Sequence, residues 1–292
     1  MDNLSSALRQ RPADLLEIRG DDRVRFLNGY VTCDVKPLAE GQGTYGFVTE
    51  VKGHILADVR VLDLGDRLWL DLPAGEGAAV AAHLGKYAVF APVEIQEVQG
   101  WQAWTVLGAA AAEKLGVDIA EPFSHVETSD GGLAVRERDL GGPAWTYWTP
   151  SEERPSLGDD LSEEVYERLR IEAGQPLFGR DFGPQNFPQE SGLENTVSYE
   201  KGCYLGQEVI ARIHYRGGVN RQLRGLRLAA ATAAGLEVHV DGRAAGTLTS
   251  TTVSSSLGPI GLAVLHKRAE PGADVDVDGA KAKVVDLASG WG

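Results

Sequence analysis

The residue types best suited to chemistry lie in one stretch, residues 201–208, which reads Lys-Gly-Cys-Tyr-Leu-Gly-Gln-Glu. It places Cys203, one of only two cysteines in the chain, between Gly202 and Gly206. Glycine permits sharp turns and lets a ligand approach the backbone closely, and a neighbouring cation such as Lys201 favours the reactive thiolate form of a cysteine. The stretch therefore predicts a reactive or ligand-contacting loop.

The alternative interpretation of this stretch is a buried, inert thiol in a tight turn, which is the usual state of a lone intracellular cysteine. Polar and charged side chains crowd around Cys203, and core segments carry few such groups, so we predict that Cys203 is a functional thiol. These side chains are Lys201, Tyr204, Gln207, Glu208, Arg212, His214, Tyr215, Arg216 and Arg221.

Three chemical roles remain open for the Cys203 thiol. Transient ligation of iron or a cluster and redox exchange with a damaged partner both benefit from thiolate character. A cysteine–histidine hydrolase would need a base, and His214 is the only one of the six histidines that lies close in the sequence. Two cysteines cannot complete a four-thiolate zinc or iron–sulfur site by themselves, so no resident metal centre is predicted.

The net charge of −14 argues against direct binding of nucleic acid, because that affinity comes from neutralising phosphates with lysine and arginine. A local exception is the run between Glu208 and Glu237, which contains no acidic residue and is expected to attract a small anionic ligand. Within it, Arg224 and Arg227 are better explained as a solvated strand edge. The arginines of the run are Arg212, Arg216, Arg221, Arg224 and Arg227.

The 292 residues, of which 43% are hydrophobic and 24% charged, have the length and composition of a globular protein with two or three domains. The longest apolar stretches are far shorter than the roughly 20 residues that span a bilayer. The first residues lack the basic start and apolar core of a secretory signal. We therefore expect a cytoplasmic protein without membrane association, with Cys33 and Cys203 as free thiols.

Short strands and helices follow one another without the regular alternation of a parallel sheet, which predicts the α+β class. A short helix is expected to start at Asp21, and a longer helix to start with a capping box of Asp160 and Glu163 and to end at Gly174. Strands are expected at residues 15–20, 44–49, 55–64, 67–72, 92–98, 103–107, 133–137 and 144–148, and further helices at 78–87 and 109–115.

The character of the sequence changes after Gly218, and a domain boundary is expected between His214 and Arg221. Short alternating strands are then separated by glycine and Asp-Gly turns, which predicts a small antiparallel sheet or barrel. The Asp-Gly pair at residues 278 and 279 is a strong signal for a hairpin. The expected domains are therefore residues 1–216 and residues 217–292.

Three segments together resemble the YgfZ family, a branch of the glycine-cleavage T-protein (aminomethyltransferase) relatives. They read LRIEAGQPLFGRDF, NFPQESGLENTVSYEKGCYLGQEVIARIHYRGG and FLNGYVTCDV, and KGCYLGQE matches the family hallmark without a mismatch. The resemblance covers essentially the whole chain. It implies two interlocked α+β subdomains around a central, tetrahydrofolate-binding opening in residues 1–216, followed by a C-terminal antiparallel β-barrel.

A folate ligand implies particular binding residues. Its pterin presents adjacent N–H donors that suit a carboxylate, and Glu172 matches the family position for this contact. Its glutamate tail suits guanidinium groups, for which Arg212 and Arg216 are the leading candidates and Arg221 is the next. Tyr204 or Tyr215 is expected to stack on the ligand, and the alternative for either is a packed aromatic between the domains.

One departure from the T-protein pattern concerns the strand that enters the folate site. T-protein relatives carry two acids in a GGIxDD pattern, whereas this chain has Ala57 followed by Asp58. Asp58 is therefore the single carboxylate expected to manage protons or orient a ligand there. Lys201 and Asp34 are expected to lie near the same opening.

The resemblance implies a tetrahydrofolate-binding factor that assists assembly or repair of iron–sulfur clusters in client enzymes, including tRNA-modifying radical enzymes, through the motif cysteine Cys203. The expected partners are those client enzymes or assembly proteins. Two alternatives stay open. One is a folate-dependent aminomethyltransferase or demethylase using Asp58, and the other is a non-catalytic protein-binding module with a vestigial folate pocket.

Overall fold

The computed structural model of the protein describes residues 4–291. Their contacts divide them into two compact units, neither of which is continuous in sequence. The N-terminal unit comprises residues 4–161 and 196–207, and the C-terminal unit comprises residues 162–195 and 208–291. The predicted domain boundary at residue 216 remains a prediction, and the barrel that it anticipates starts at Arg221.

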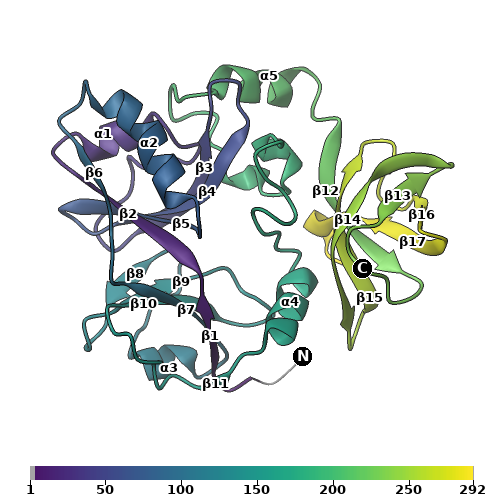
Figure 1. Ribbon diagram of the computed structural model, residues 1–292, viewed down its shortest axis with the longest axis horizontal. Coiled ribbons are helices and arrows are strands. Elements are labelled where there is room, and N and C mark those ends of the chain that lie inside the picture. The colour runs from purple at the N-terminus through teal and green to yellow at the C-terminus, as the bar shows by residue number, and fades with distance from the viewer. Residues whose placement is uncertain (1–3, 292) are drawn as a thin grey trace. The chain divides into compact units, whose positions relative to one another are not determined.

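The first sheet of the N-terminal unit is antiparallel and has the strand order β3-β4-β5-β2-β6 (Figure 1). Helices α1 (Arg23–Asn28) and α2 (Gly77–Ala88) cover one of its faces. Leu16 and Ile18 point toward these helices and Leu15 toward the opposite face, as the two-residue period of a strand requires. The strands are β2 (Ala13–Arg19), β3 (Gly43–Thr49), β4 (Ile55–Asp63), β5 (Arg67–Pro73) and β6 (Glu94–Glu97).

The second sheet of the same unit has the order β11-β1-β7-β10-β9-β8. It packs against the first sheet through a buried cluster that includes Trp69 and Trp148, and α3 (Ala111–Leu115) covers its other face. The unit is therefore built in layers of helix, sheet, sheet and helix. The strands are β1 (Ala7–Arg11), β7 (Gln102–Leu107), β8 (His125–Glu127), β9 (Leu133–Arg136), β10 (Ala144–Thr149) and β11 (Asp159–Asp160).

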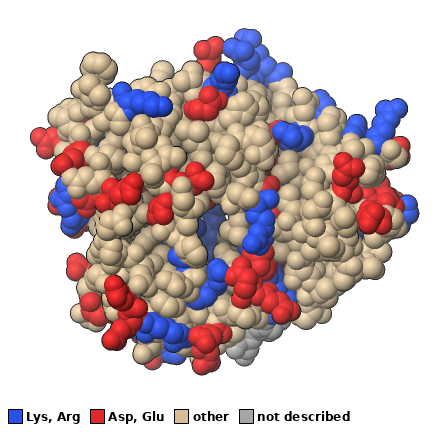
Figure 2. Space-filling model, viewed as in Figure 1, with Lys and Arg blue, Asp and Glu red and all other residues tan. Residues whose placement is uncertain are grey.

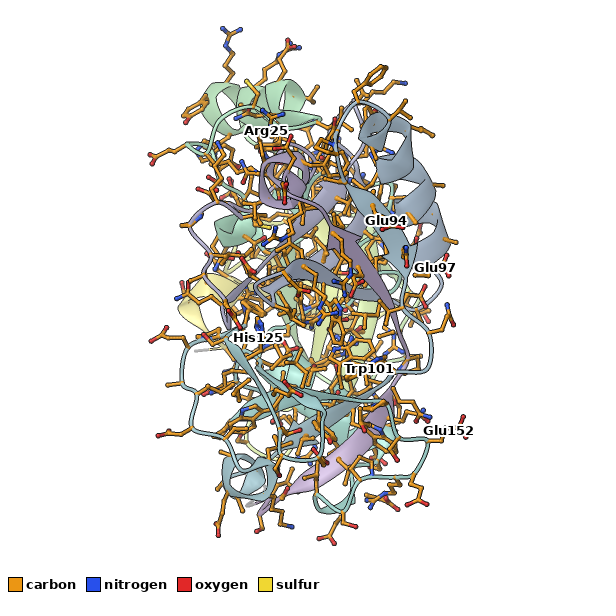
Figure 3. All side chains as sticks on the ribbon, turned by 90° about the vertical axis from the view of Figure 1, so that its left-hand side faces the viewer. Arg25, Glu94, Glu97, Trp101, His125 and Glu152 are labelled. Atoms are coloured by element: carbon orange, nitrogen blue, oxygen red, sulfur yellow. The ribbon has the colours of Figure 1, made fainter. Side chains whose placement is uncertain are left out.

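The open edge of the first sheet is formed by β6, whose Glu94 and Glu97 are exposed to solvent (Figure 3). Charged side chains on an edge strand oppose pairing with another chain. The segment that leaves β6 is fixed by Trp101, whose ring packs edge-on against Trp69 with a centroid distance of 4.9 Å. This edge is thus protected by charge rather than by a covering element.

The C-terminal unit contains α4 (Glu163–Glu172), most of α5 (Gln207–Arg216) and a closed antiparallel barrel of order β12-β15-β14-β13-β16-β17 (Figure 1). The barrel closes because β12 pairs with both β15 and β17. The Asp-Gly turns at residues 241–242 and 278–279 have positive φ at both positions, as hairpin turns of type I′ require. The strands are β12 (Arg221–Leu228), β13 (Glu237–Val240), β14 (Arg243–Ser254), β15 (Gly258–His266), β16 (Asp274–Val277) and β17 (Ala280–Val285).

The α+β class, the C-terminal barrel and most predicted elements are confirmed, but two helix starts are not. The first helix begins after Asp22 rather than Asp21, and the Asp22 side chain makes no capping bond. Helix α4 begins after Ser162, whose Oγ accepts an amide hydrogen bond of the first turn at 3.3 Å. The predicted capping box of Asp160 and Glu163 is therefore wrong, because Ser162 occupies the position that accepts this bond.

Charged side chains of both signs are interspersed on the face shown in Figure 2. That face does not present the broad basic surface by which proteins neutralise a nucleic-acid backbone. Among the helices of residues 4–291, none combines the length and the apolar character needed to cross a bilayer.

Candidate functional site

Cys203 lies on an irregular segment, residues 198–206, that precedes α5 and belongs to the N-terminal unit. Main-chain hydrogen bonds fix both ends of this cysteine segment. The Ser198 amide donates to Thr32 O at 2.9 Å, and the Leu205 amide donates to Gly29 O at 2.9 Å. The Cys203 side chain between these anchors is exposed. The predicted loop is confirmed as a loop, and its thiol is not the buried one of the alternative interpretation.

Lys201 is arranged differently from the free cation that the sequence suggested. Its ammonium is buried and donates to Asn28 O at 2.5 Å and to Val31 O at 2.6 Å. It also lies 4.9 Å from the centroid of the buried Tyr204 ring. Burial lowers the pKa of Lys201 to about 8. The Lys201 ammonium is therefore engaged inside the protein, and its role in favouring the Cys203 thiolate remains a prediction.

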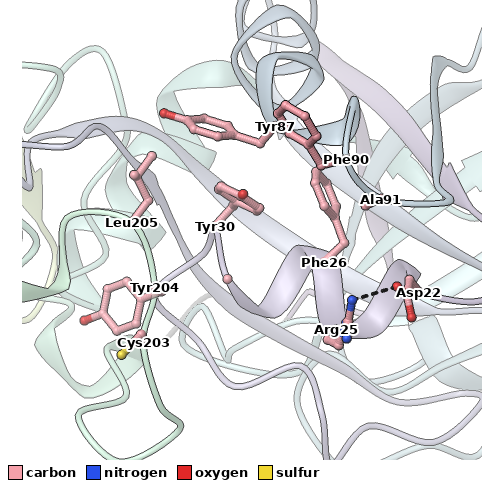
Figure 4. Close-up of a pocket in the computed structure, with 11 residues that line it drawn as sticks. Asp22, Arg25, Phe26, Tyr30, Tyr87, Phe90, Ala91, Cys203, Tyr204 and Leu205 are labelled. Carbon is pink, nitrogen blue, oxygen red and sulfur yellow. Dashed lines mark hydrogen bonds and ion pairs between the residues drawn. The ribbon is translucent and has the colours of Figure 1, made fainter.

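A pocket of about 560 Å³ opens beside Cys203 (Figure 4). One wall is aromatic, since the Tyr30 ring stacks on Tyr87 with a centroid distance of 4.7 Å and contacts Phe26 at 4.8 Å. Phe90, which also lines the pocket, is 91% exposed. The cysteine segment forms the other wall. The volume falls in the range of small-molecule sites, and the thiol therefore borders a preformed, largely aromatic pocket.

Asp58 lies on β4 and is 9% exposed. The Tyr45 hydroxyl donates to Asp58 Oδ2 at 2.5 Å, whereas Oδ1 has no hydrogen-bond partner among the described residues. Burial raises the pKa of Asp58, and the positive charge of Arg60 opposes that rise. The carboxyl group therefore holds a proton more readily than an exposed aspartate, and Oδ1 is a buried acceptor without a donor among the described residues. Asp58 does not line the pocket beside Cys203.

The sequence reasoning missed Tyr45, which bonds to Asp58, and Arg138, which lies over the Tyr45 ring. Tyr45 is paired across β3 and β4 with Arg60, and the guanidinium groups of Arg60 and Arg138 lie 5.6 and 5.2 Å from its ring centroid. Burial lowers the pKa of Arg138, which forms no ion pair within residues 4–291. The register of the β3–β4 hairpin was a usable signal for Tyr45, whereas Arg138 arrives from a distant segment that no local pattern identifies.

The remaining predicted ligand residues are divided between the two units. Glu172, Arg212, Arg216 and Arg221 belong to the C-terminal unit, where Arg212 and Arg221 lie 2.8 and 3.5 Å from glutamates of that unit. Arg216 is exposed in the last turn of α5, and Glu172 is half-buried at the end of α4. Asp34 belongs to the N-terminal unit, where its Oδ1 accepts the amide two residues later at 3.2 Å. Their roles toward a ligand remain predictions.

The glycines of the motif give the first testable prediction. Gly206 has φ +83°, and a Cβ there would lie 2.6 Å from Glu50 O, whereas Gly202 has φ +97° and open space around it. Replacing Gly202 by alanine is expected to cost about 1–2 kcal/mol of unfolding free energy through backbone strain alone. Gly206→Ala is expected to cost about 1–3 kcal/mol more, because the added methyl group clashes with the main chain.

Urea denaturation of the two alanine variants measures this difference. Gly202→Ala is the matched control, since it introduces the same side chain at a similar φ without the clash. Equal midpoints for the two variants would contradict the tight packing of the cysteine segment at Gly206.

Comparison with known proteins places the fold and the motif in a family. The GCVT N-terminal domain matches residues 12–126. The aminomethyltransferase T of the glycine cleavage system from Bartonella henselae shares the fold, with a TM-score of 0.87 over 98% of this chain and 86% of that protein, at 20% sequence identity. This likeness confirms the predicted T-protein-like fold.

Among curated relatives, the tRNA-modifying protein YgfZ of Vibrio atlanticus is 30% identical over 70% of this chain and 64% of its own length. A putative chloroplastic transferase of Arabidopsis thaliana is 29% identical over 87% of this chain and 63% of its own length, so the chain spans less than two thirds of these two relatives. The tRNA-modifying protein YgfZ of Yersinia enterocolitica is 30% identical over 72% of this chain and 67% of its own length. With the KGCYLGQE segment intact and the fold matched, the chain belongs to the YgfZ family.

Proposed function

We propose that the protein is a folate-binding factor that maintains iron–sulfur clusters in client enzymes, among them enzymes that modify tRNA, and that Cys203 is its functional thiol. The observation that carries the proposal is an exposed thiol on an anchored segment, at the edge of an aromatic pocket, in a chain of the YgfZ family. An exposed cysteine at a pocket is suited to contact a partner, whereas a structural cysteine is buried.

The buried acid of the N-terminal unit fits a folate derivative. Asp58 Oδ1 is buried and lacks a donor within the described part of the chain, and the amino-pyrimidinone edge of a pterin carries such donors. Asp58 would hold this edge or a reacting amine. The contact of Glu172 with a pterin is a separate proposal. The folate would supply the acceptor or donor of a one-carbon unit.

The role proposed for Cys203 is that of a single, transient ligand or redox partner. Residues 4–291 contain no group of three or more histidine, cysteine or acidic side chains arranged to hold a metal ion. A cluster in contact with Cys203 would therefore take its other ligands from the client protein, as cargo that passes between proteins. The exposed Phe90 and the aromatic wall beside the thiol offer apolar surface for that encounter.

A second candidate function is supported by Asp58 itself. A buried carboxyl group with a raised pKa is typical of general acid–base catalysis, and aminomethyl transfer to folate needs such a group. The protein would then be a folate-dependent aminomethyltransferase or demethylase. Formation of 5,10-methylenetetrahydrofolate from an aminomethyl donor by the purified protein is the observation that would favour this function.

The decisive experiment deletes the gene in its own host and assays several iron–sulfur enzymes, tRNA modification and glycine-dependent growth. Loss of cluster enzymes and of tRNA modification with intact use of glycine supports the proposed function. The opposite pattern supports the transferase. Normal values in all three assays would reject both and leave a protein-binding module.

A second prediction concerns the folate contact. Asp58→Asn is expected to weaken tetrahydrofolate binding at least about tenfold, because the amide is a weaker acceptor than a carboxylate and its NH2 group faces ligand donors. Titration calorimetry with the full chain measures this change. Asp66→Asn, on the exposed turn after β4, is the matched control and is expected to bind as the wild type does. Equal affinity of both variants would remove Asp58 from the site.

A further inference from the structure

We infer that Lys201 is a positioning residue, which pins the cysteine segment onto residues 28–31 and thereby fixes where the Cys203 thiol stands at the aromatic pocket. This inference rests on the proposed function only in treating Cys203 as the functional thiol. Lys201 would then hold the cysteine segment in place, whereas its position next to Cys203 in the sequence suggested that it stabilises the thiolate.

The contacts of the Lys201 ammonium account for all its donors. Two N–H groups point to the main-chain oxygens of Asn28 and Val31, at 2.5 and 2.6 Å. The third side of the ammonium meets Asn28 Oδ1 at 3.5 Å and the Tyr204 ring at 4.9 Å. A lysine has three donors, so no N–H remains to stabilise a thiolate at Cys203. Direct activation of the thiol by Lys201 therefore does not fit the geometry.

The residues that receive Lys201 flank two pocket-lining residues, and Val31 forms a bridge to Val48 of β3. Asn28 closes α1, and its Oδ1 also accepts the Val35 amide at 3.0 Å, so the lysine joins an existing buried network. Gly29 and Tyr30, the next two residues, line the pocket. A shift of Lys201 would therefore move the cysteine segment relative to the aromatic wall.

The same segment has few other anchors near the thiol. The Leu205 amide bonds to Gly29 O, and Thr49 Oγ1 donates to Leu205 O at 2.8 Å, both on the C-terminal side of Cys203. On the N-terminal side Lys201 lies only two residues from the thiol, across Gly202, which has open space around it. Glycine alone would leave this side free to move. Besides the Ser198 amide on Thr32 O and the Lys201 amide on Ser198 Oγ, the Lys201 side chain supplies the constraint on this side.

Burial of the Lys201 ammonium makes its protonated form less favourable than that of an exposed lysine. Desolvation lowers the pKa of Lys201 to about 8, with Cys33 and Asp34 opposing the shift and Lys36 adding to it. A neutral amine still has two N–H groups for the two carbonyl oxygens, so the anchor persists when the proton is lost. The constraint on Cys203 is therefore expected to hold on both sides of this pKa.

The test compares Lys201→Met with the wild type and with Lys201→Arg in the full chain. Methionine keeps the apolar stem and removes the donors, whereas arginine keeps a cation with donors. Hydrogen exchange of the Leu205 amide is expected to rise at least about tenfold in Lys201→Met, because two charge-assisted hydrogen bonds are lost, and to return toward the wild-type rate in Lys201→Arg. Lys36→Met is the control for loss of a nearby charge.

Alkylation of Cys203 by iodoacetamide, followed by peptide mass spectrometry across a range of pH, separates positioning from direct activation. Positioning predicts that the shape of the pH profile is retained in Lys201→Met while the segment exchanges faster. A displaced pH profile with unchanged exchange overturns the inference in favour of direct activation. An equal rise of exchange throughout the N-terminal unit also overturns it, since Lys201 would then be a general stabilising residue.

A substitute variant covers the case in which Lys201→Met does not fold, and the two readouts do not depend on the proposed function. If Lys201→Met does not fold, Lys201→Gln takes its place, because its shorter amide cannot reach both carbonyl oxygens. Both readouts use purified protein and no client enzyme. Failure of the proposed function would appear instead as full client activity in cells that carry Cys203→Ala.

Discussion

Under the proposed function, cells that depend on this protein are expected to lose the activity of client iron–sulfur enzymes by at least about 100-fold when Cys203 is replaced by serine, because the substitution removes the proposed functional thiol. The protein should remain folded. Cys203 is exposed, and exposed substitutions usually change the unfolding free energy by no more than about 0.5 kcal/mol. Client activity in complemented deletion cells and urea denaturation of the purified variant measure the two effects.

Cys33→Ser is the matched control for this prediction. Cys33 is 3% exposed, and burial raises the pKa of its thiol to about 11, so it remains a neutral core residue at ordinary pH. A serine hydroxyl there is expected to destabilise the fold by about 1–3 kcal/mol while client activity persists at permissive temperature. Loss of activity in both variants in proportion to their stability would show that the thiol of Cys203 has no chemical role.

The sequence predicted the features that depend on local rules. Positive φ in the Asp-Gly turn at residues 278–279 and the loop around Cys203 follow from the residue types alone. Alternation predicted the barrel strands that bury one face, such as β13, in which Val238 and Val240 are buried. The barrel could be anticipated because its strands are short, regularly spaced and separated by clear turns.

The features that were missed depend on partners far away in the sequence. Lys201 and Asn28 are separated by 173 residues, and no local pattern shows that the ammonium turns inward. β1 was not predicted, because its sequence Ala-Leu-Arg-Gln-Arg becomes a strand only beside β7. Arg138 likewise reaches Tyr45 only in the folded protein. The folded structure, rather than the local sequence, decides where these side chains lie. Whether Glu172 and Arg212 contact a ligand likewise could not be decided from the local sequence.

The second large effect is expected at Asp181, which joins α4 to the barrel inside the C-terminal unit. Its carboxylate is fully buried and accepts hydrogen bonds from Arg170 and the Leu177 amide, both at 2.9 Å, and from Thr249 and Ser250, both at 2.6 Å. Arg170 is 1% exposed, so each charge depends on the other. Asp181→Ala is expected to lower the unfolding free energy by about 3–5 kcal/mol, because the buried Arg170 guanidinium loses one of its carboxylate partners.

A control variant and a double variant test whether the unpaired buried charge causes the loss of stability in Asp181→Ala. Lys281→Ala removes an exposed pair with Asp276 in the same unit and is expected to change stability by no more than about 1 kcal/mol. The double variant Arg170→Met with Asp181→Leu should be more stable than Asp181→Ala, since it removes both charges and fills the space. Glu167, which also pairs with Arg170, keeps Arg180 as a partner in that variant. A double variant less stable than Asp181→Ala would instead show that the hydrogen bonds of Ser250 and its neighbours hold α4 on the barrel.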